Sequence, residues 1–286
     1  MIPCGRFAPS PTGRLHRGSL LAALASFLDM RSRGGRWLLR MEDLDPPREE
    51  AGAARAILDC LQAHGLEPDD DVLWQSRRSE AYLAALAQLD RDGHLFACSC
   101  SRREQGPEGS CRGNCRIAPP PPDRPAALRV RVPRDYRCQW QDSWQGAQDW
   151  PLGAQLSDFV VRRKDGLFAY QLAVVVDDAA QGVTRVVRGA DLLDSTPRQR
   201  LLQDLLGYPP PAYAHIPVLT AANGQKLSKQ NHAPPLDSRR AADNLRDALS
   251  LLRQPPPPEH LRQCGEILGH AAAHWTPAAI PCAPSL

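Results

Sequence analysis

Two short segments about two hundred residues apart limit most strongly what this chain can fold into. The first, residues 9–19 (PSPTGRLHRGS), follows a strand-like stretch at residues 4–8 and precedes a helix that we expect to begin near Gly18. A helix N-terminus presents free N–H groups and the positive end of its dipole to an anion, and His16 can donate to phosphate oxygens. The segment predicts a phosphate-binding turn, although Pro and Gly also form plain structural turns.

The second segment, residues 226–230 (KLSKQ), carries two lysines three positions apart on an expected loop. Lys226 and Lys229 can neutralise the charge that spreads over a triphosphate during displacement. Taken alone, the pentapeptide also fits an exposed basic turn. Taken together, the two segments predict a split ATP site.

A third segment, residues 40–48 (RMEDLDPPR), follows an apolar run at residues 37–39 that fits a buried parallel strand. Open α/β sheets bind ligands just beyond the carboxyl ends of their strands. Glu42 and the acidic residues after it are therefore expected at a ligand-binding edge.

The length and charge of the chain allow several classes of protein. Its 286 residues suffice for one large or two modest domains, and its net charge of +3 permits a local nucleic-acid-binding patch without requiring one. Residues 1–6 lack the pattern of a signal peptide, and no apolar stretch approaches membrane-spanning length. We therefore expect a cytoplasmic protein with reduced or metal-bound cysteines.

Four of the nine cysteines fall within eighteen positions. They form two close pairs separated by a glycine-containing loop and are Cys98, Cys100, Cys111 and Cys115. Four thiolates so spaced suit a closed tetrahedral zinc site, which leaves no open position for water. The sequence therefore predicts one structural zinc ion per chain, with two disulfides as the alternative that an intracellular protein disfavours.

Apolar strands and amphipathic helices alternate from residue 4 to about residue 95, with helices expected at 49–65 and 78–93, each ending on glycine. This pattern is typical of a nucleotide-binding α/β domain. The cysteine segment, a run of four prolines at 119–122 and strands around 127–132 would form an insertion that a metal holds together.

After the insertion we expect the parallel sheet to resume with strands at 168–176 and 184–187. Asp177 and Asp178 would then cap a following turn or face a substrate. Helices are expected at 238–252 and 259–274.

In this order the segments resemble the signatures of class I aminoacyl-tRNA synthetases of the glutamyl type. Residues 16–19 (HRGS) stand for the HIGH signature, with Ser19 in place of the second histidine, and residues 226–230 stand for KMSKS, with Leu227 for methionine and Gln230 for the last serine. Ser19 can still donate to phosphate, so we expect activity. The resemblance runs from about residue 6 to about residue 252 and includes YQLA at 170–173 and VRGADLL at 187–193.

The resemblance implies an α/β fold, a Rossmann-type class I catalytic domain with a zinc-containing insertion and a C-terminal helical portion. The two halves of the catalytic domain would be residues 1–95 and 151–236, the insertion 96–150 and the helical portion 237–286.

Position by position, the resemblance also implies the site. The glutamate pocket would comprise Arg6, Ala8, Ser10, Glu42, Tyr170 and Arg188. The ATP site would comprise His16, Gly18, Ser19, Lys226, Ser228 and Lys229. The catalytic groups among these would be His16, Ser19, Lys226 and Lys229.

The charges of the implied pocket suit its ligand. An amino acid with two carboxylates and one ammonium needs two guanidinium partners and one carboxylate, which Arg6, Arg188 and Glu42 supply. Local sequence leaves two alternatives open, a surface ion pair for Arg188 and a packing role for a half-buried Tyr170.

Within this family the chain resembles the short paralogues that glutamylate queuosine in tRNA(Asp), and we expect it to lack an anticodon-binding portion. The resemblance implies a monomeric ligase that activates L-glutamate with ATP, accompanied by Mg²⁺, and transfers the glutamyl group to queuosine at the wobble position. The alternatives are a short synthetase that charges a tRNA 3′ end and a catalytically inactive, zinc-stabilised RNA-binding paralogue.

Overall fold

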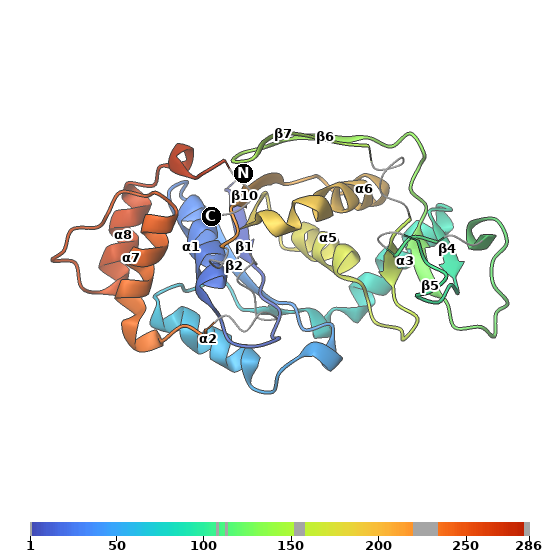
Figure 1. Cartoon of the computed structure of the whole chain (residues 1–286), viewed down its shortest axis with the longest axis horizontal. Coiled ribbons are helices and arrows are strands. Elements are labelled where there is room, and N and C mark those ends of the chain that lie inside the picture. The colour runs from blue at the N-terminus through green and yellow to red at the C-terminus, as the bar shows by residue number, and fades with distance from the viewer. Residues whose placement is uncertain (1, 107–108, 112–113, 152–157, 220–233, 283–286) are drawn as a thin grey trace.

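A computed structural model describes residues 2–106, 109–111, 114–151, 158–219 and 234–282. Parallel strands and helices form the centre of the molecule, an antiparallel sheet lies at one end, and two C-terminal helices lie at the other (Figure 1). The lysine-bearing segment at residues 226–230 falls outside the described residues.

The parallel strands form two groups that adjoin. β1 (Cys4–Phe7), β2 (Arg36–Met41) and β3 (Leu73–Trp74) pair in that order, and β9 (Arg185–Gly189) pairs with β10 (Ala212–Ile216). The N–H of Thr184 donates to the carbonyl of Cys4 at 2.9 Å, which sets the start of β9 beside β1. The strand predictions at 4–8, 37–39 and 184–187 are thereby confirmed, and the carboxyl ends of β1, β2 and β9 converge.

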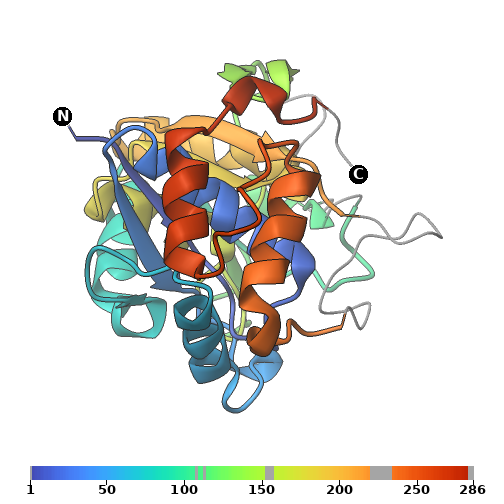
Figure 2. The ribbon, with the colours of Figure 1, turned by 90° about the vertical axis from the view of Figure 1, so that its left-hand side faces the viewer.

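Helix α1 (Arg17–Arg31) is the centre of the main hydrophobic core. Leu20, Leu24 and Leu28 are 2% exposed or less, because the helix packs against the sheet and against α7 (Ala241–Leu251) and α8 (Cys264–Ala273). Figure 2 shows α7 and α8 side by side over this part of the molecule. Burial on nearly all sides explains why α1 is apolar around most of its circumference.

Helices α2 (Ala53–Ala63) and α3 (Ser79–Arg91) confirm two of the predicted helices and begin within the predicted ranges. Gly65 and Gly93 follow them with φ values of +71° and +74°. Only glycine adopts this left-handed conformation without steric cost, so each helix ends where the sequence predicts.

The predicted strand at residues 168–176 is wrong. Residues Tyr170–Ala180 form helix α5, and Leu172, Ala173, Val174, Val175 and Val176 are all buried in a second core with α3 and α6 (Thr196–Leu206). A helix that is buried on all sides reads as a continuous apolar run, which periodicity does not distinguish from a buried strand.

The prediction that Asp177 and Asp178 cap a turn is also wrong. Both lie inside α5, with exposed fractions of 0% and 5%. Asp177 accepts hydrogen bonds from Gln75, Arg78 and Tyr82, and Asp178 accepts from Arg6. These partners satisfy two carboxylates inside an apolar helix.

The remaining strands are antiparallel. β4 (Leu95–Cys98), β5 (Ala127–Val130) and β8 (Val160–Arg162) form one sheet, and β6 (Cys138–Asp142) and β7 (Gly146–Trp150) form a hairpin. The hairpin runs along the upper edge of Figure 1 and reaches β10, where the N–H of Ser143 donates to the carbonyl of Tyr213.

The two C-terminal helices are confirmed, and both begin a few residues later than predicted. A single 3₁₀ turn, Ser238–Arg240, precedes α7, and α8 begins after a capping box formed by Gln263 and Glu266. Among the described residues, further single 3₁₀ turns are Pro46–Arg48, Gln75–Arg77, Asn114–Arg116 and Pro277–Ala279, and Ala190–Ser195 forms a 3₁₀ helix of six residues. Within the described part of the chain, no helix is both long and apolar enough to cross a membrane.

Candidate functional site

A cavity of about 460 Å³ opens where β1, β2 and β9 end, beside the first turn of α5. We call it the inner cavity. All six residues predicted to bind the amino acid line it, together with Phe7, Ala22, Arg48, Val187, Gly189 and Leu192. The six are Arg6, Ala8, Ser10, Glu42, Tyr170 and Arg188. The topology thus gathers residues spread over more than half of the chain at one sheet edge.

A second cavity of about 190 Å³, the helix cavity, lies at the N-terminus of α1. His16, Gly18 and Ser19 line it, and it shares Ala22 and Gly189 with the inner cavity. The predicted phosphate-binding turn and the predicted amino-acid pocket are therefore neighbours, as a reaction between their ligands requires.

His16 is the N-cap of α1. Its Nδ1 accepts a hydrogen bond from the N–H of Ser19 at 3.3 Å. In the neutral ring this places the proton on Nε2, which makes Nε2 a donor.

Lys226, Ser228 and Lys229 lie outside the described residues. The described residues on either side of that segment both contact the region of His16, because Leu219 lines the helix cavity and Pro235 forms a β-bridge with His16. The N–H of Leu236 also donates to the carbonyl of Leu15 at 2.9 Å.

An ion-pair network adjoins the inner cavity, which two of its members, Arg6 and Glu42, line. Arg6 contacts Asp178 through Nε and Nη2, at 3.0 and 3.3 Å, and Arg40 Nη2 lies 2.8 Å from the same carboxylate. Arg40 Nη2 also lies 3.7 Å from Oε1 of Glu42. Burial acts to raise the pKa of Asp178, but Arg6 and Arg40 outweigh it and hold that pKa below its ordinary value.

Glu42 is the carboxylate that the network leaves for a ligand. Its Oε1 is buried and has no hydrogen-bond partner among the described residues. Burial raises the pKa of Glu42 to about 7, although Arg40 and Arg6 act in the opposite direction. Glu42 also lines the inner cavity, so its carboxylate can meet the ammonium group of a ligand there.

Arg188 is held by neutral acceptors. Its Nε donates to His215 Nε2 at 3.0 Å, while Nη1 and Nη2 donate to four oxygen atoms. These belong to Tyr170 Oη, Gln199 Oε1, the carbonyl of Leu192 and Thr196 Oγ1, at 3.3, 2.8, 3.2 and 2.8 Å. The exposed fraction of Arg188 is 5%, and no carboxylate of the described residues forms an ion pair with it, so the surface ion pair considered above is wrong. Its positive charge is available to an anionic ligand.

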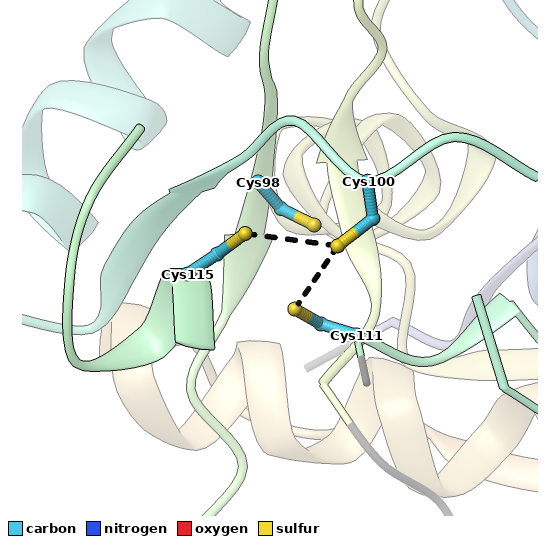
Figure 3. Close-up of side chains that lie close together, drawn as sticks. All are labelled: Cys98, Cys100, Cys111 and Cys115. Carbon is cyan, nitrogen blue, oxygen red and sulfur yellow. Dashed lines mark hydrogen bonds between the residues drawn. The ribbon is translucent and has the colours of Figure 1, made fainter. Parts of the chain in front are cut away.

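The predicted zinc ligands come together at the end of β4 (Figure 3). The four Sγ atoms lie within 4.8 Å of one another, and Sγ of Cys100 lies 3.7 Å from Sγ of both Cys111 and Cys115. A tetrahedral zinc ion with Zn–S bonds of about 2.3 Å separates its ligands by about 3.8 Å. The cluster therefore fits zinc, and none of the four cysteines forms a disulfide.

Sequence reasoning missed several residues of the site. Arg40 and Asp178 complete the ion-pair network, and Gln199, Thr196 and His215 hold Arg188. The available signal was a charged residue inside an otherwise apolar run, which is the case for Arg40 in β2 and Asp178 in α5. Gln199 and Thr196 carry no such signal.

The chain is similar to known proteins in family, sequence and fold. Residues 4–107 and 120–253 match the family model described as tRNA synthetases class I (E and Q), catalytic domain. A glutamyl-Q tRNA(Asp) synthetase of Ectopseudomonas mendocina (strain ymp) is 53% identical over 280 residues, which cover 97% of this chain and 94% of the relative. A protein of the same name from Thiobacillus denitrificans is 52% identical over 288 residues, covering 98% and 95%.

The fold is similar to that of glutamate-tRNA synthetase from Elizabethkingia anophelis. The TM-score is 0.83 at 22% identity, and the match covers 100% of this chain and 68% of the other. A glutamate tRNA ligase from Elizabethkingia meningosepticum gives a TM-score of 0.82 at 22% identity, covering 100% and 67%.

The cysteine cluster yields a prediction that does not depend on the substrate. Purified protein should contain about one zinc ion per chain, and Cys111→Ser should lower this content severely because a closed site loses one of four thiolates. Elemental analysis of the metal measures the outcome. Cys264→Ser, which changes a half-buried cysteine outside the cluster, should retain full zinc. Metal-free protein with four reactive thiols in the cluster would contradict the assignment.

Proposed function

The chain belongs to the family of class I tRNA synthetases for glutamate and glutamine, and we propose that it activates L-glutamate with ATP and transfers the glutamyl group to queuosine at the wobble position of tRNA(Asp). Membership of this family confirms the sequence-based predictions of an α/β catalytic domain and of a ligase. The substrate, the acceptor and the roles of single residues are the content of the proposal.

The observation that supports glutamate as the substrate is the set of side chains that line the inner cavity. Two of its guanidinium groups, those of Arg6 and Arg188, can pair with two carboxylates, and the carboxylate of Glu42, which also lines the cavity, can accept from the ammonium. Glutamine would leave a buried guanidinium without a carboxylate.

Activation would proceed by attack of a glutamate carboxylate oxygen on the α-phosphorus of ATP, bound as its magnesium complex. The bond from that phosphorus to the bridging oxygen breaks, pyrophosphate leaves, and glutamyl adenylate remains. The N-terminus of α1, His16 Nε2 and Ser19 would stabilise the phosphate oxygens from the helix cavity. Lys226 and Lys229 would add charge that is needed most in the transition state.

Transfer would follow without a covalent enzyme intermediate. A hydroxyl oxygen of the queuosine cyclopentenediol attacks the acyl carbon, and AMP leaves. The name shared by relatives that are 51–53% identical over nearly the whole chain supports this acceptor. A third cavity of about 300 Å³ shares Ser10, Glu42, Arg48 and Tyr170 with the inner cavity and could receive part of the acceptor nucleoside.

Arg188→Ala tests the glutamate pocket. The loss of a buried, charge-assisted partner worth on the order of 2 kcal/mol or more should lower kcat/KM for glutamate at least about thirtyfold. Glutamate-dependent pyrophosphate exchange gives the rate, and ATP binding should persist. The control is Arg137→Ala, which removes an exposed arginine paired with Asp149, and its kcat/KM for glutamate should equal that of the unchanged protein. Unchanged exchange kinetics in Arg188→Ala would remove this residue from the pocket.

Glu42 predicts a dependence on pH. Its pKa of about 7 means that the carboxylate loses its charge as the pH falls below 7, and the charged form is the one that binds ammonium. As the pH falls below 7, we expect kcat/KM for glutamate to decrease, and the decrease should approach tenfold for each pH unit. ATP also changes its protonation in this pH range, so the control is the variant Glu42→Gln. This variant should be less active at neutral pH and should not show the decrease in kcat/KM at low pH. If the same decrease at low pH is found in Glu42→Gln, another group causes it and the prediction is wrong.

The acceptor is tested by offering labelled glutamate and ATP with tRNA(Asp) that carries or lacks queuosine, and with an isolated queuosine-bearing anticodon stem loop. We expect labelling of both queuosine-bearing RNAs and none of the RNA that lacks queuosine. Periodate oxidation of the RNA before the reaction should abolish labelling of the stem loop, because it destroys the vicinal diol. Labelling of tRNA(Glu) that requires an intact 3′ adenosine and ignores queuosine would favour a short synthetase that charges a 3′ end.

A further inference from the structure

We propose that Asp142 and His215 are positioning residues for the substrate carboxylate, with Asp142 fixing the tautomer of His215 and His215 fixing the guanidinium of Arg188. The proposal rests on the glutamate-binding role proposed for Arg188. It assigns a function in substrate binding to a residue of the β6–β7 hairpin, which lines none of the three cavities described above.

The tautomer of His215 follows from its contact with Arg188. The Nε of an arginine carries one hydrogen and can only donate, so His215 Nε2, at 3.0 Å from it, accepts. The proton of the neutral ring is therefore on Nδ1, and Nδ1 lies 2.5 Å from Oδ2 of Asp142. Both residues have an exposed fraction of 0%, so water does not compete for these bonds.

The surroundings of Asp142 keep its carboxylate ionised. Oδ1 accepts hydrogen bonds from the backbone N–H groups of Trp144, Gln145 and His215 at 3.0, 2.9 and 3.1 Å, and Oδ2 accepts from the His215 ring. Burial acts to raise the pKa of Asp142, but these donors outweigh it and lower the pKa to about 2. An ionised Asp142 accepts through both oxygens, which leaves Nδ1–H as the only compatible tautomer of a neutral His215.

Burial and the charge of Arg188 keep His215 neutral. Burial lowers the pKa of His215, and Arg188 lowers it further against the opposing effect of Asp142. A protonated ring would turn an N–H towards the Nε–H of Arg188, so only the neutral ring supports the observed contact. The chain of bonds from Asp142 to Arg188 thus has one consistent assignment of hydrogens.

The orientation of Arg188 depends on this chain. Of its five acceptors, His215 is the one that contacts Nε, and together with the acceptors of Nη1 and Nη2 it holds the guanidinium plane. The face of the guanidinium also lies over the ring of Tyr213, with Cζ 5.4 Å from the ring centroid. A plane held from these two directions presents its charge to the inner cavity in one orientation.

Asp142→Asn tests the proposal by replacing one carboxylate oxygen with an NH₂ group. The oxygen of the amide must face the three backbone N–H groups, so its NH₂ faces Nδ1 of His215. The ring must then accept at Nδ1 and carry its proton on Nε2, where it opposes the Nε–H of Arg188. We expect the KM for glutamate in pyrophosphate exchange to rise at least about tenfold, while the KM for ATP changes less than about twofold.

Asp149→Asn is the matched control for kinetics. It makes the same substitution in the same hairpin, at an exposed residue of β7 that pairs with Arg137, and should leave both KM values unchanged. The tautomer of His215 can be determined from long-range ¹H–¹⁵N correlations of protein with ¹⁵N-labelled histidine. The His215 signal is identified as the one that is absent in His215→Gln. We expect Nδ1–H in the unchanged protein and Nε2–H in Asp142→Asn, a difference that loss of stability alone does not produce.

A second pair of variants keeps the proposal testable if Asp142→Asn does not fold. His215→Gln supplies a side-chain oxygen that can accept from Arg188 Nε, and the KM for glutamate should stay within about threefold. His215→Met has a similar volume and no such acceptor, and the KM should rise at least about tenfold. Equal KM values in these two variants, or an Nε2–H tautomer in the unchanged protein, would overturn the proposal.

The outcomes also separate this proposal from the function on which it rests. An unchanged KM for glutamate in folded Asp142→Asn, together with impaired Arg188→Ala, would overturn the positioning role and leave glutamate binding by Arg188 in place. Normal exchange in Arg188→Ala would refute the role of Arg188 in binding, and with it the positioning role of Asp142 and His215.

Discussion

The carboxylate of Asp178, held between two buried arginines, is the interaction on which the site depends. It joins Arg6 of β1 and Arg40 of β2 to helix α5 across more than 130 residues of sequence. Removing it would leave two guanidinium groups buried without their counter-ion, at a cost of about 3–5 kcal/mol. Because Arg6 lines the inner cavity and Arg40 approaches Glu42, the same ion pairs that hold α5 against the sheet also set the charges that a ligand meets.

Local chemistry made part of this structure predictable from sequence. The turn before α1, the glycines after α2 and α3, the apolar run of β2 and the four clustered cysteines each carry their signal within a few residues. The six residues expected at the amino-acid pocket came from a resemblance to a family, and the fold does bring them to one cavity. Their roles in binding stay predictions.

Long-range contacts explain what the sequence did not predict. Residues 168–176 resemble a strand because residues 172–176 form a continuous apolar run whose side chains are all buried, and only the packing of α5 against α3 and α6 decides in favour of a helix. The role of Asp142 is not predictable from sequence either, since nothing near it indicates that it contacts His215, which lies 73 residues later in the chain. The role of a buried polar group depends on the hydrogen-bond partner that the fold places beside it.

The two arginines of the inner cavity differ in the charge of their surroundings, and this difference suggests different tasks. Arg6 is already neutralised by Asp178, so a carboxylate from a ligand adds a hydrogen bond but relieves little unpaired charge. Arg188 has five neutral acceptors, which satisfy its hydrogens, and no carboxylate of the described residues is in direct contact with it. An incoming carboxylate compensates that charge, whereas a neutral amide does not. Discrimination between an acidic substrate and its amide should therefore depend more on Arg188, and on the histidine that orients it, than on Arg6.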